Sequence, residues 1–126
     1  QNYNNNALNL SYGSHDLLSN EYSNDLSHLK YHFKRRSEKL QVNSHHQITC
    51  STFIQWICQY RRLNNIDVRL QLNGIFCQIQ SSLINQGVYR PSSFTIDFHG
   101  FLVCLQRIAQ TFQINLRHFV KTLIQM

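Results

Sequence analysis

Two histidines one helical turn apart are the first residues here whose spacing could serve a chemical purpose. His28 and His32 stand four positions apart, which lets two imidazoles on one face of a helix hold the same zinc ion. A structural zinc centre takes four ligands, but no closely spaced pair of cysteines accompanies these histidines. We therefore expect no metal site, and zinc at His28 and His32 is the alternative.

Other reactive residues are dispersed along the chain. The six acidic residues are scattered singly, whereas general acid–base catalysis needs two titratable groups held together. No nucleophile-elbow, zinc-protease or phosphate-loop motif occurs. The four cysteines, Cys50, Cys58, Cys77 and Cys104, each lie among apolar residues, which is typical of buried, reduced thiols. These patterns predict an intracellular protein, cytoplasmic or nuclear, that is not an enzyme and needs no cofactor.

Basic residues outnumber acidic ones by twelve to six, for a formal charge of +6. Five of them fall within the ten residues KYHFKRRSEK. They are Lys30, Lys34, Arg35, Arg36 and Lys39. On a helix, several of these cations would share one face and could contact the phosphates of a nucleic acid. A basic domain can equally bind an acidic protein, so nucleic-acid binding stands as the alternative function.

Apolar residues recur at helical intervals beyond the first fourteen positions. Residues 1–14 are rich in asparagine and carry no charge, so we expect a flexible tail there and a single helical domain over 15–126. Helices are predicted over 16–41 and from Thr49 or Ser51 to about Asn64-Asn65. No run of eighteen apolar residues occurs, which argues against a membrane span.

The second half of the chain predicts two further helices. A short strand over 94–98 leads into a helix that starts near Asp97, and the last helix runs over 116–125 with Asn115 as its cap. The stretch 66–87 fits a helix that ends at Gly87. Residues 66–80 also fit a hairpin that turns at Asn73-Gly74. The sequence thus predicts a mainly α, compact helical domain, with an α+β fold as the alternative.

Three segments share an isoleucine followed five residues later by a phenylalanine in a predicted helix. They are Ile48 with Phe53, Ile96 with Phe101, and Ile114 with Phe119. This spacing resembles the second half of an EF-hand, in which a loop isoleucine pairs with a partner hand. The segments QITCSTFIQWIC, IDFHGFLVCLQRIAQTF and INLRHFVKTLIQM look like the first, fourth and fifth hands of the penta-EF-hand family, which includes calpain regulatory domains and sorcin-like proteins. The resemblance implies a domain built from EF-hand-like helix pairs.

The matching loops lack the ligands that calcium needs. An EF-hand loop ends in a bidentate glutamate, but the corresponding residues here are Thr52, Gly100 and His118. In the second loop, Asp97 is the only acid. We therefore expect calcium binding to be lost.

The resemblance also implies how the protein would act. Its family members are regulatory modules that pair through their last hand, typically with a related domain. In this chain the apolar residues of that segment are Phe119, Val120, Leu123 and Ile124. The expectation is a non-catalytic regulatory module that associates with a protein partner, or with a second copy, through these side chains.

Overall fold

The computed structural model describes residues 23–39, 46–85 and 95–125. These residues form a mainly helical domain, as the sequence predicts, with one small sheet. Along the chain the elements are α2 (Ser23–Arg36), β1 (Glu38–Lys39), β2 (His46–Thr49), α3 (Cys50–Ile57), the 3-10 helix η2 (Arg61–Leu63), α4 (Ile66–Asn85), β3 (Thr95–Asp97), α5 (Phe98–Phe112) and α6 (Leu116–Ile124). The expected tail at 1–14 and the expected cap at Gly87 lie outside the described residues.

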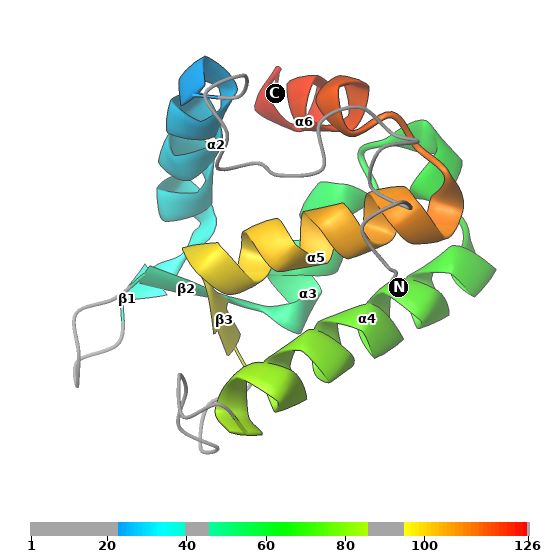
Figure 1. Ribbon diagram of the computed structural model, residues 1–126, viewed down its shortest axis with the longest axis horizontal. Helices are drawn as coiled ribbons and strands as arrows, with labels where there is room; N and C mark the ends of the chain where they lie inside the picture. The colour runs from blue at the N-terminus through cyan, green and yellow to red at the C-terminus, as the bar shows by residue number, and fades with distance from the viewer. Residues whose placement is uncertain (1–22, 40–45, 86–94, 126) are drawn as a thin grey trace, which may run out of the picture.

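The sheet joins the two halves of the chain. Its three strands lie in the order β1-β2-β3, and both pairings are antiparallel. Ile48 of β2 stands opposite Ile96 of β3, and both side chains are fully buried. β2 leads directly into α3 and β3 directly into α5, so the sheet fixes where both helices begin (Figure 1).

Residues 66–85 form one continuous helix, so the hairpin alternative is wrong. The stripe of Leu72, Phe76, Ile79 and Leu83 is buried, because α4 lays this face against α3 and α5. Gly74 falls in the helix interior and forms no turn. A regular apolar stripe over twenty residues outweighs the local preference of Asn-Gly for a turn.

Two helices end earlier than the sequence predicts. α2 ends at Arg36 rather than near residue 41, because the Ser37 backbone N–H and hydroxyl both donate to the carbonyl of Lys34, at 3.3 and 2.9 Å. α3 ends at Ile57 rather than near Asn64-Asn65. The chain then tightens into i→i−3 hydrogen bonds, which bring Tyr60 and Leu63 into the core.

Side-chain caps set the starts of the helices, and these starts confirm the sequence predictions. Thr49 accepts a hydrogen bond from the Thr52 N–H at the start of α3. Asp97 accepts one from the Gly100 N–H at 2.9 Å to begin α5. Asn115 does the same for α6 at 3.0 Å from the His118 N–H. Each cap pairs a backbone donor that the first turn cannot pair within the helix.

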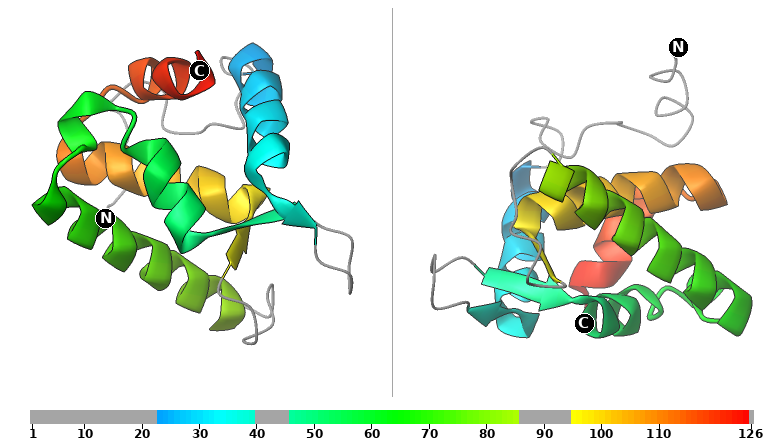
Figure 2. Two further views of the ribbon diagram at one scale, coloured as in Figure 1. Left: turned by 180° about the vertical axis from the view of Figure 1, so that it is seen from behind. Right: turned by 90° about the horizontal axis from the view of Figure 1, so that it is seen from below.

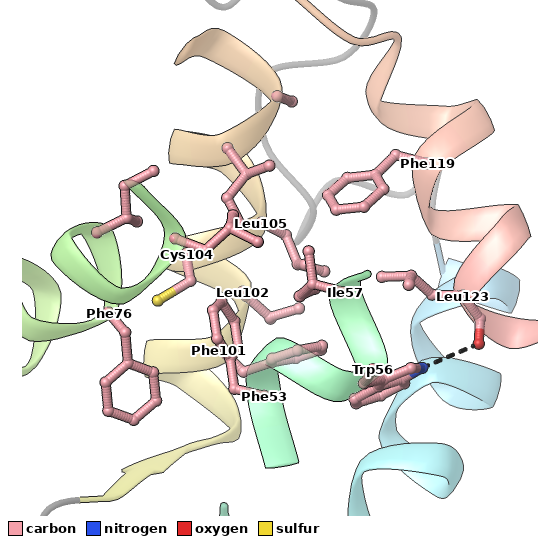
Figure 3. Close-up of a cluster of buried hydrophobic side chains, with 14 of the residues drawn as sticks. Phe53, Trp56, Ile57, Phe76, Phe101, Leu102, Cys104, Leu105, Phe119 and Leu123 are labelled. Carbon is pink, nitrogen blue, oxygen red and sulfur yellow. Dashed lines mark hydrogen bonds between the residues drawn. The ribbon is translucent and has the colours of Figure 1, made fainter. Parts of the chain in front are cut away.

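Aromatic rings fill the centre of the domain around Phe101 of α5 (Figure 3). Its ring stacks on Trp56 with centroids 4.7 Å apart and an interplanar angle of 8°. The Phe33 and Phe53 rings lie 5.4 and 6.1 Å away. Phe33 belongs to α2, and Trp56 and Phe53 belong to α3. The Phe101 side chain therefore links α5 to both of these helices. Figure 2 shows α5 in two further views, with α4 and α6 packed against it.

Candidate functional site

The apolar face of α6 is turned into the domain rather than toward solvent. Phe119, Val120 and Leu123 are 0, 1 and 0% exposed, and Ile124 alone keeps partial exposure. Three of the four side chains are therefore already covered within the domain, and partner binding by these residues stays a prediction. The chain itself covers them, because α6 packs against α2 and α5.

Polar contacts hold α6 in this position. The Trp56 indole N–H donates to the carbonyl oxygen of Leu123 at 3.2 Å (Figure 3). Lys121 forms an ion pair with the largely buried Asp25 of α2, with 3.3 Å between Nζ and Oδ1. An apolar stripe shows that one face of a helix is buried, but the stripe alone does not identify what covers it.

Large apolar side chains are exposed elsewhere. Among the described residues, those most exposed are Tyr31 at 59%, Ile66 at 76% and Leu70 at 69%. Ile66 and Leu70 stand one turn apart near the start of α4, so they lie on the same face of that helix. Sequence analysis missed this pair because it lies off the buried stripe of the same helix. The sequence does contain a signal for this pair, since Ile66 and Leu70 are apolar residues of the predicted helix that do not belong to its buried stripe.

A groove of about 500 Å³ lies between α3 and α4 at this point. It is lined by Cys50, Ser51, Ile54 and Gln55 of α3 and by Ile66, Arg69, Leu70 and Asn73 of α4. Its walls are mainly apolar, and amide and hydroxyl groups stand among them. A groove of this size and composition is typical of sites that take up part of a ligand or a partner's side chains.

The polar groups of the groove are neutral apart from one arginine. Cys50 Sγ lies 3.0 Å from Asn73 Oδ1. Burial, together with the neighbouring Cys77, raises the pKa of the Cys50 thiol to about 11. At physiological pH this sulfur is therefore a thiol, which is far less nucleophilic than a thiolate. Arg69 donates to the amide oxygen of Asn64 at 3.1 Å, so its charge is not neutralised by that contact.

The two histidines of the zinc alternative lie on α2 as expected, but they differ in environment. His28 is exposed, and His32 is half-buried with its Nδ1 3.4 Å from an Arg36 nitrogen. Burial and the Arg36 charge lower the pKa of His32, which keeps its imidazole neutral. Within 23–39, 46–85 and 95–125, no group of three or more His, Cys, Asp or Glu side chains is placed to hold a metal ion.

The five predicted phosphate-contacting residues do not form one uniform face. Lys30, Lys34 and Arg35 are exposed on α2. Arg36 is half-buried, and its guanidinium carbon lies 4.6 Å from the centre of the Trp56 ring. Lys39 belongs to β1 instead of continuing the helix. The structure thus keeps Lys30 and Lys34 together, whereas Arg36 serves the packing of α2 on α3.

No helix among the described residues is long and apolar enough to cross a bilayer. Comparison with protein-family models, with curated proteins and with solved structures finds no match to this chain.

Proposed function

We propose that this protein is a non-catalytic interaction module whose α3–α4 groove binds an amphipathic helical segment of another protein. The observation that carries the proposal is the exposure of Ile66 and Leu70 at the edge of the groove. When a partner covers these two side chains, their removal from water stabilises the complex by about 25 cal/mol per Å² of apolar surface buried. An apolar pair of this kind beside a groove is typical of surfaces that receive a partner helix.

The groove also sets what the segment should present. Ile54, Ile66 and Leu70 offer apolar contacts, so the partner should carry large apolar residues at i, i+4 and i+7 of one helical face. Asn73 and Gln55 can hydrogen-bond to the polar flank of such a helix. The neutral Cys50 thiol adds a small apolar contact without a charge to desolvate.

Charge indicates the sign of the partner's flank. Arg69 lines the groove, and its guanidinium donates to the neutral amide of Asn64. The whole chain carries a formal charge of +6. An acidic residue flanking the partner's apolar stripe would therefore gain from Arg69 and from long-range attraction, which chiefly speeds association.

We further propose that two helix–strand–helix units, α2–β2–α3 and α4–β3–α5, are degenerate EF-hands that no longer bind calcium. The pairing of Ile48 with Ile96, each followed five residues later by a buried phenylalanine, supports this proposal. The loss of calcium binding is supported by Gly100, which stands where the last carboxylate ligand would be required. Asp97 is the only acid in this loop, and its Oδ1 caps α5 by accepting from the Gly100 N–H.

A display library of random segments about sixteen residues long, roughly four helical turns, tests the proposed groove. Binders selected on the full chain should show apolar residues at helical spacing and an acidic flank. Leu70→Asp should weaken their binding by at least about tenfold, because it places a charge in an apolar contact. Gln71→Asp is the matched control. It adds the same charge to the next exposed position of α4, outside the groove, and should leave binding nearly unchanged.

The outcomes separate the proposed partner from the others. Selected binders that respond equally to Leu70→Asp and Gln71→Asp would show that the groove is not the binding site. Loss of self-association in the Leu70→Asp variant by sedimentation, without any effect on selected peptides, would assign the groove to a second copy of this chain. A basic flank in the selected sequences would contradict the assigned role of Arg69.

A further inference from the structure

A second pocket lies on a different face of the domain, where α2 meets the sheet and the start of α5. Its volume is about 290 Å³. It is lined by Lys30, Phe33 and Lys34 of α2, by His46 of β2, and by Asp97, Phe98 and His99 at the β3–α5 junction. It shares no lining residue with the α3–α4 groove. Nothing in the proposed protein-binding function uses these side chains.

Two lysines provide the positive charge of the pocket. Lys30 and Lys34 are exposed and stand one turn apart on α2, so both can reach the same space. Neither ammonium group makes a hydrogen bond or ion pair with the residues of 23–39, 46–85 and 95–125. Two like charges held side by side without an acid between them repel one another, and a bound anion would relieve that repulsion.

Two histidines from other elements than α2 also line the pocket. His46 is held through Nδ1, which is 2.9 Å from the Ser37 hydroxyl. Its other ring nitrogen therefore stays available to a ligand. His99 is exposed in the first turn of α5. A ring N–H of an imidazole can donate a hydrogen bond to an anion that lies beside it.

One acid also lines the pocket. Asp97 is engaged as the cap of α5, since its Oδ1 accepts the hydrogen bond of the Gly100 N–H. The lysines outweigh its single negative charge even when both histidines are neutral. Protonation of either histidine would raise the excess further. The charge of the pocket thus suits an anion that carries about two negative charges at neutral pH, as a phosphate monoester does.

The remaining wall is aromatic. The rings of Phe33 and Phe98 lie 5.3 Å apart in an edge-to-face arrangement. Phe33 is buried, and Phe98 is half-buried beside the pocket. A small inorganic ion would leave this apolar wall uncovered, whereas a ligand with an aromatic or apolar body would cover it.

We propose that this pocket binds a phosphate monoester carried on an aromatic or apolar body. Lys30 and Lys34 contact the phosphate oxygens as point charges, His46 and His99 donate to the same oxygens, and Phe98, with the buried Phe33 ring packed behind it, contacts the body. Such a group occurs both in small phosphorylated metabolites and in phosphorylated side chains of proteins. The shared chemistry is the phosphate monoester next to an apolar ring.

Phenyl phosphate titrated into the isotope-labelled full chain tests this site by NMR. We expect saturable binding at one site, with a dissociation constant on the order of millimolar, as is usual for a ligand of this size. The imidazole resonances of His46 and His99 should shift on binding, because a phosphate would lie beside both rings. The groups that line the pocket and titrate are Lys30, Lys34, His46, Asp97 and His99. Unchanged His46 and His99 resonances would refute the site.

Charge-removing variants provide the second measurement. Lys30→Gln and Lys34→Gln should each weaken phenyl phosphate binding by about tenfold, because each removes a charge-assisted contact. Both lysines are exposed, so the fold should survive, which circular dichroism would verify. Arg107→Gln removes one exposed charge from α5 outside the pocket and should change binding less than twofold by loss of general attraction alone. If all three variants weakened phenyl phosphate binding equally, the binding would be non-specific charge attraction and the proposal would be wrong.

Comparison of ligands identifies the source of the group. Tighter binding of a phosphotyrosine peptide than of phenyl phosphate would assign the phosphate to a protein partner, and equal binding would assign it to a small metabolite. Inorganic phosphate that binds as well as phenyl phosphate would contradict the role of the aromatic wall. Tighter binding of a single-stranded oligonucleotide, with a steep loss in salt, would replace this proposal with nucleic-acid binding through Lys30 and Lys34.

Discussion

Trp56 contacts parts of the chain that lie far apart in sequence. Its indole N–H donates to the Leu123 carbonyl of α6 at 3.2 Å, its ring stacks on Phe101 of α5, and the Arg36 guanidinium of α2 lies over it at 4.6 Å. The side chain is 1% exposed. A hydrogen bond, an aromatic stack and a cation–π contact thus meet at one residue, which makes it the most sensitive single position for stability.

Replacing Trp56 with phenylalanine should test this role. The smaller ring leaves the Leu123 carbonyl without its indole donor and opens space beside Phe101. We expect the free energy of unfolding to fall by roughly 2–4 kcal/mol. Urea unfolding followed by far-UV circular dichroism measures the change. Arg36→Gln, which removes the cation but keeps the indole hydrogen bond, should cost about 1 kcal/mol. A loss from Trp56→Phe no larger than from Arg36→Gln would contradict the assignment.

Cys104 predicts how stability depends on pH in the alkaline range. Burial raises the pKa of its thiol to about 12, with a smaller contribution from Cys50. In the unfolded chain the thiol titrates near 9.0, its ordinary value. Above that pH the unfolded chain has lost a proton that the folded chain keeps. The contribution to stability is therefore complete below about pH 9 and is lost progressively as the pH rises toward 12.

The expected size follows from about 1.4 kcal/mol per pK unit. Between about pH 8.5 and about pH 10.5, Cys104 alone should lower the free energy of unfolding by roughly 2 kcal/mol. Cys104→Ala should remove that part of the slope, although it destabilises the protein at every pH by leaving a cavity. Val103→Ala, a truncation at the neighbouring position of α5 without a titrating group, should keep the full slope. An identical slope in both variants would show that Cys104 does not titrate as argued.

At the scale of the elements, local chemistry predicted the beginnings of helices better than their ends. Asn115 was predicted as a cap, and a helix start was predicted near Asp97, because a short polar side chain before an apolar stripe satisfies a backbone N–H of the first turn. The end of α2 at Arg36 depends on Ser37 bonding back to Lys34, and on the pairing of β1 with β2. The end of α3 depends on burying Tyr60 and Leu63. Strand pairing and burial are tertiary contacts, which a local sequence pattern does not contain.

Gly74 tests the helical assignment of α4 directly. It lies in the middle of the helix, and a methyl group built on its Cα would meet no other atom within 4 Å. Gly74→Ala should therefore stabilise the protein by about 0.5–1 kcal/mol, through the better helix propensity of alanine. Thermal unfolding measures the change.

The control for this substitution lies in the same helix. Ser81→Ala, at an exposed position of α4, should stabilise by a smaller amount, about 0.5 kcal/mol or less. A turn at Asn73-Gly74 would require a positive φ that alanine adopts only with strain. Destabilisation by Gly74→Ala would therefore indicate a turn and refute the helix at this position.

At the scale of the whole molecule, burial decides which apolar helix faces can meet a partner. The sequence marks both the stripe of α6 and the pair on α4 as apolar, but it does not state which of them the chain covers itself. α6 lies beside α2 and is covered (Figure 1). Ile66 and Leu70 of α4, in contrast, stay exposed. The surface predicted on α6 and the candidate groove beside α4 would therefore both bind a partner by burying apolar side chains, but they lie on different helices.

Two substitutions of leucine by aspartate separate these two surfaces. Leu123 is fully buried, so Leu123→Asp would place a carboxylate in the core and should cost more than about 4 kcal/mol. That is a large share of the roughly 5–15 kcal/mol by which a domain of this kind is stable, so the variant should lose its fold. Leu70 is 69% exposed, and Leu70→Asp should change the free energy of unfolding by no more than about 0.5 kcal/mol. Urea unfolding of both variants measures the contrast. A folded Leu123→Asp chain that has merely dissociated from a partner would restore α6 as the interaction surface and overturn the packing described for it.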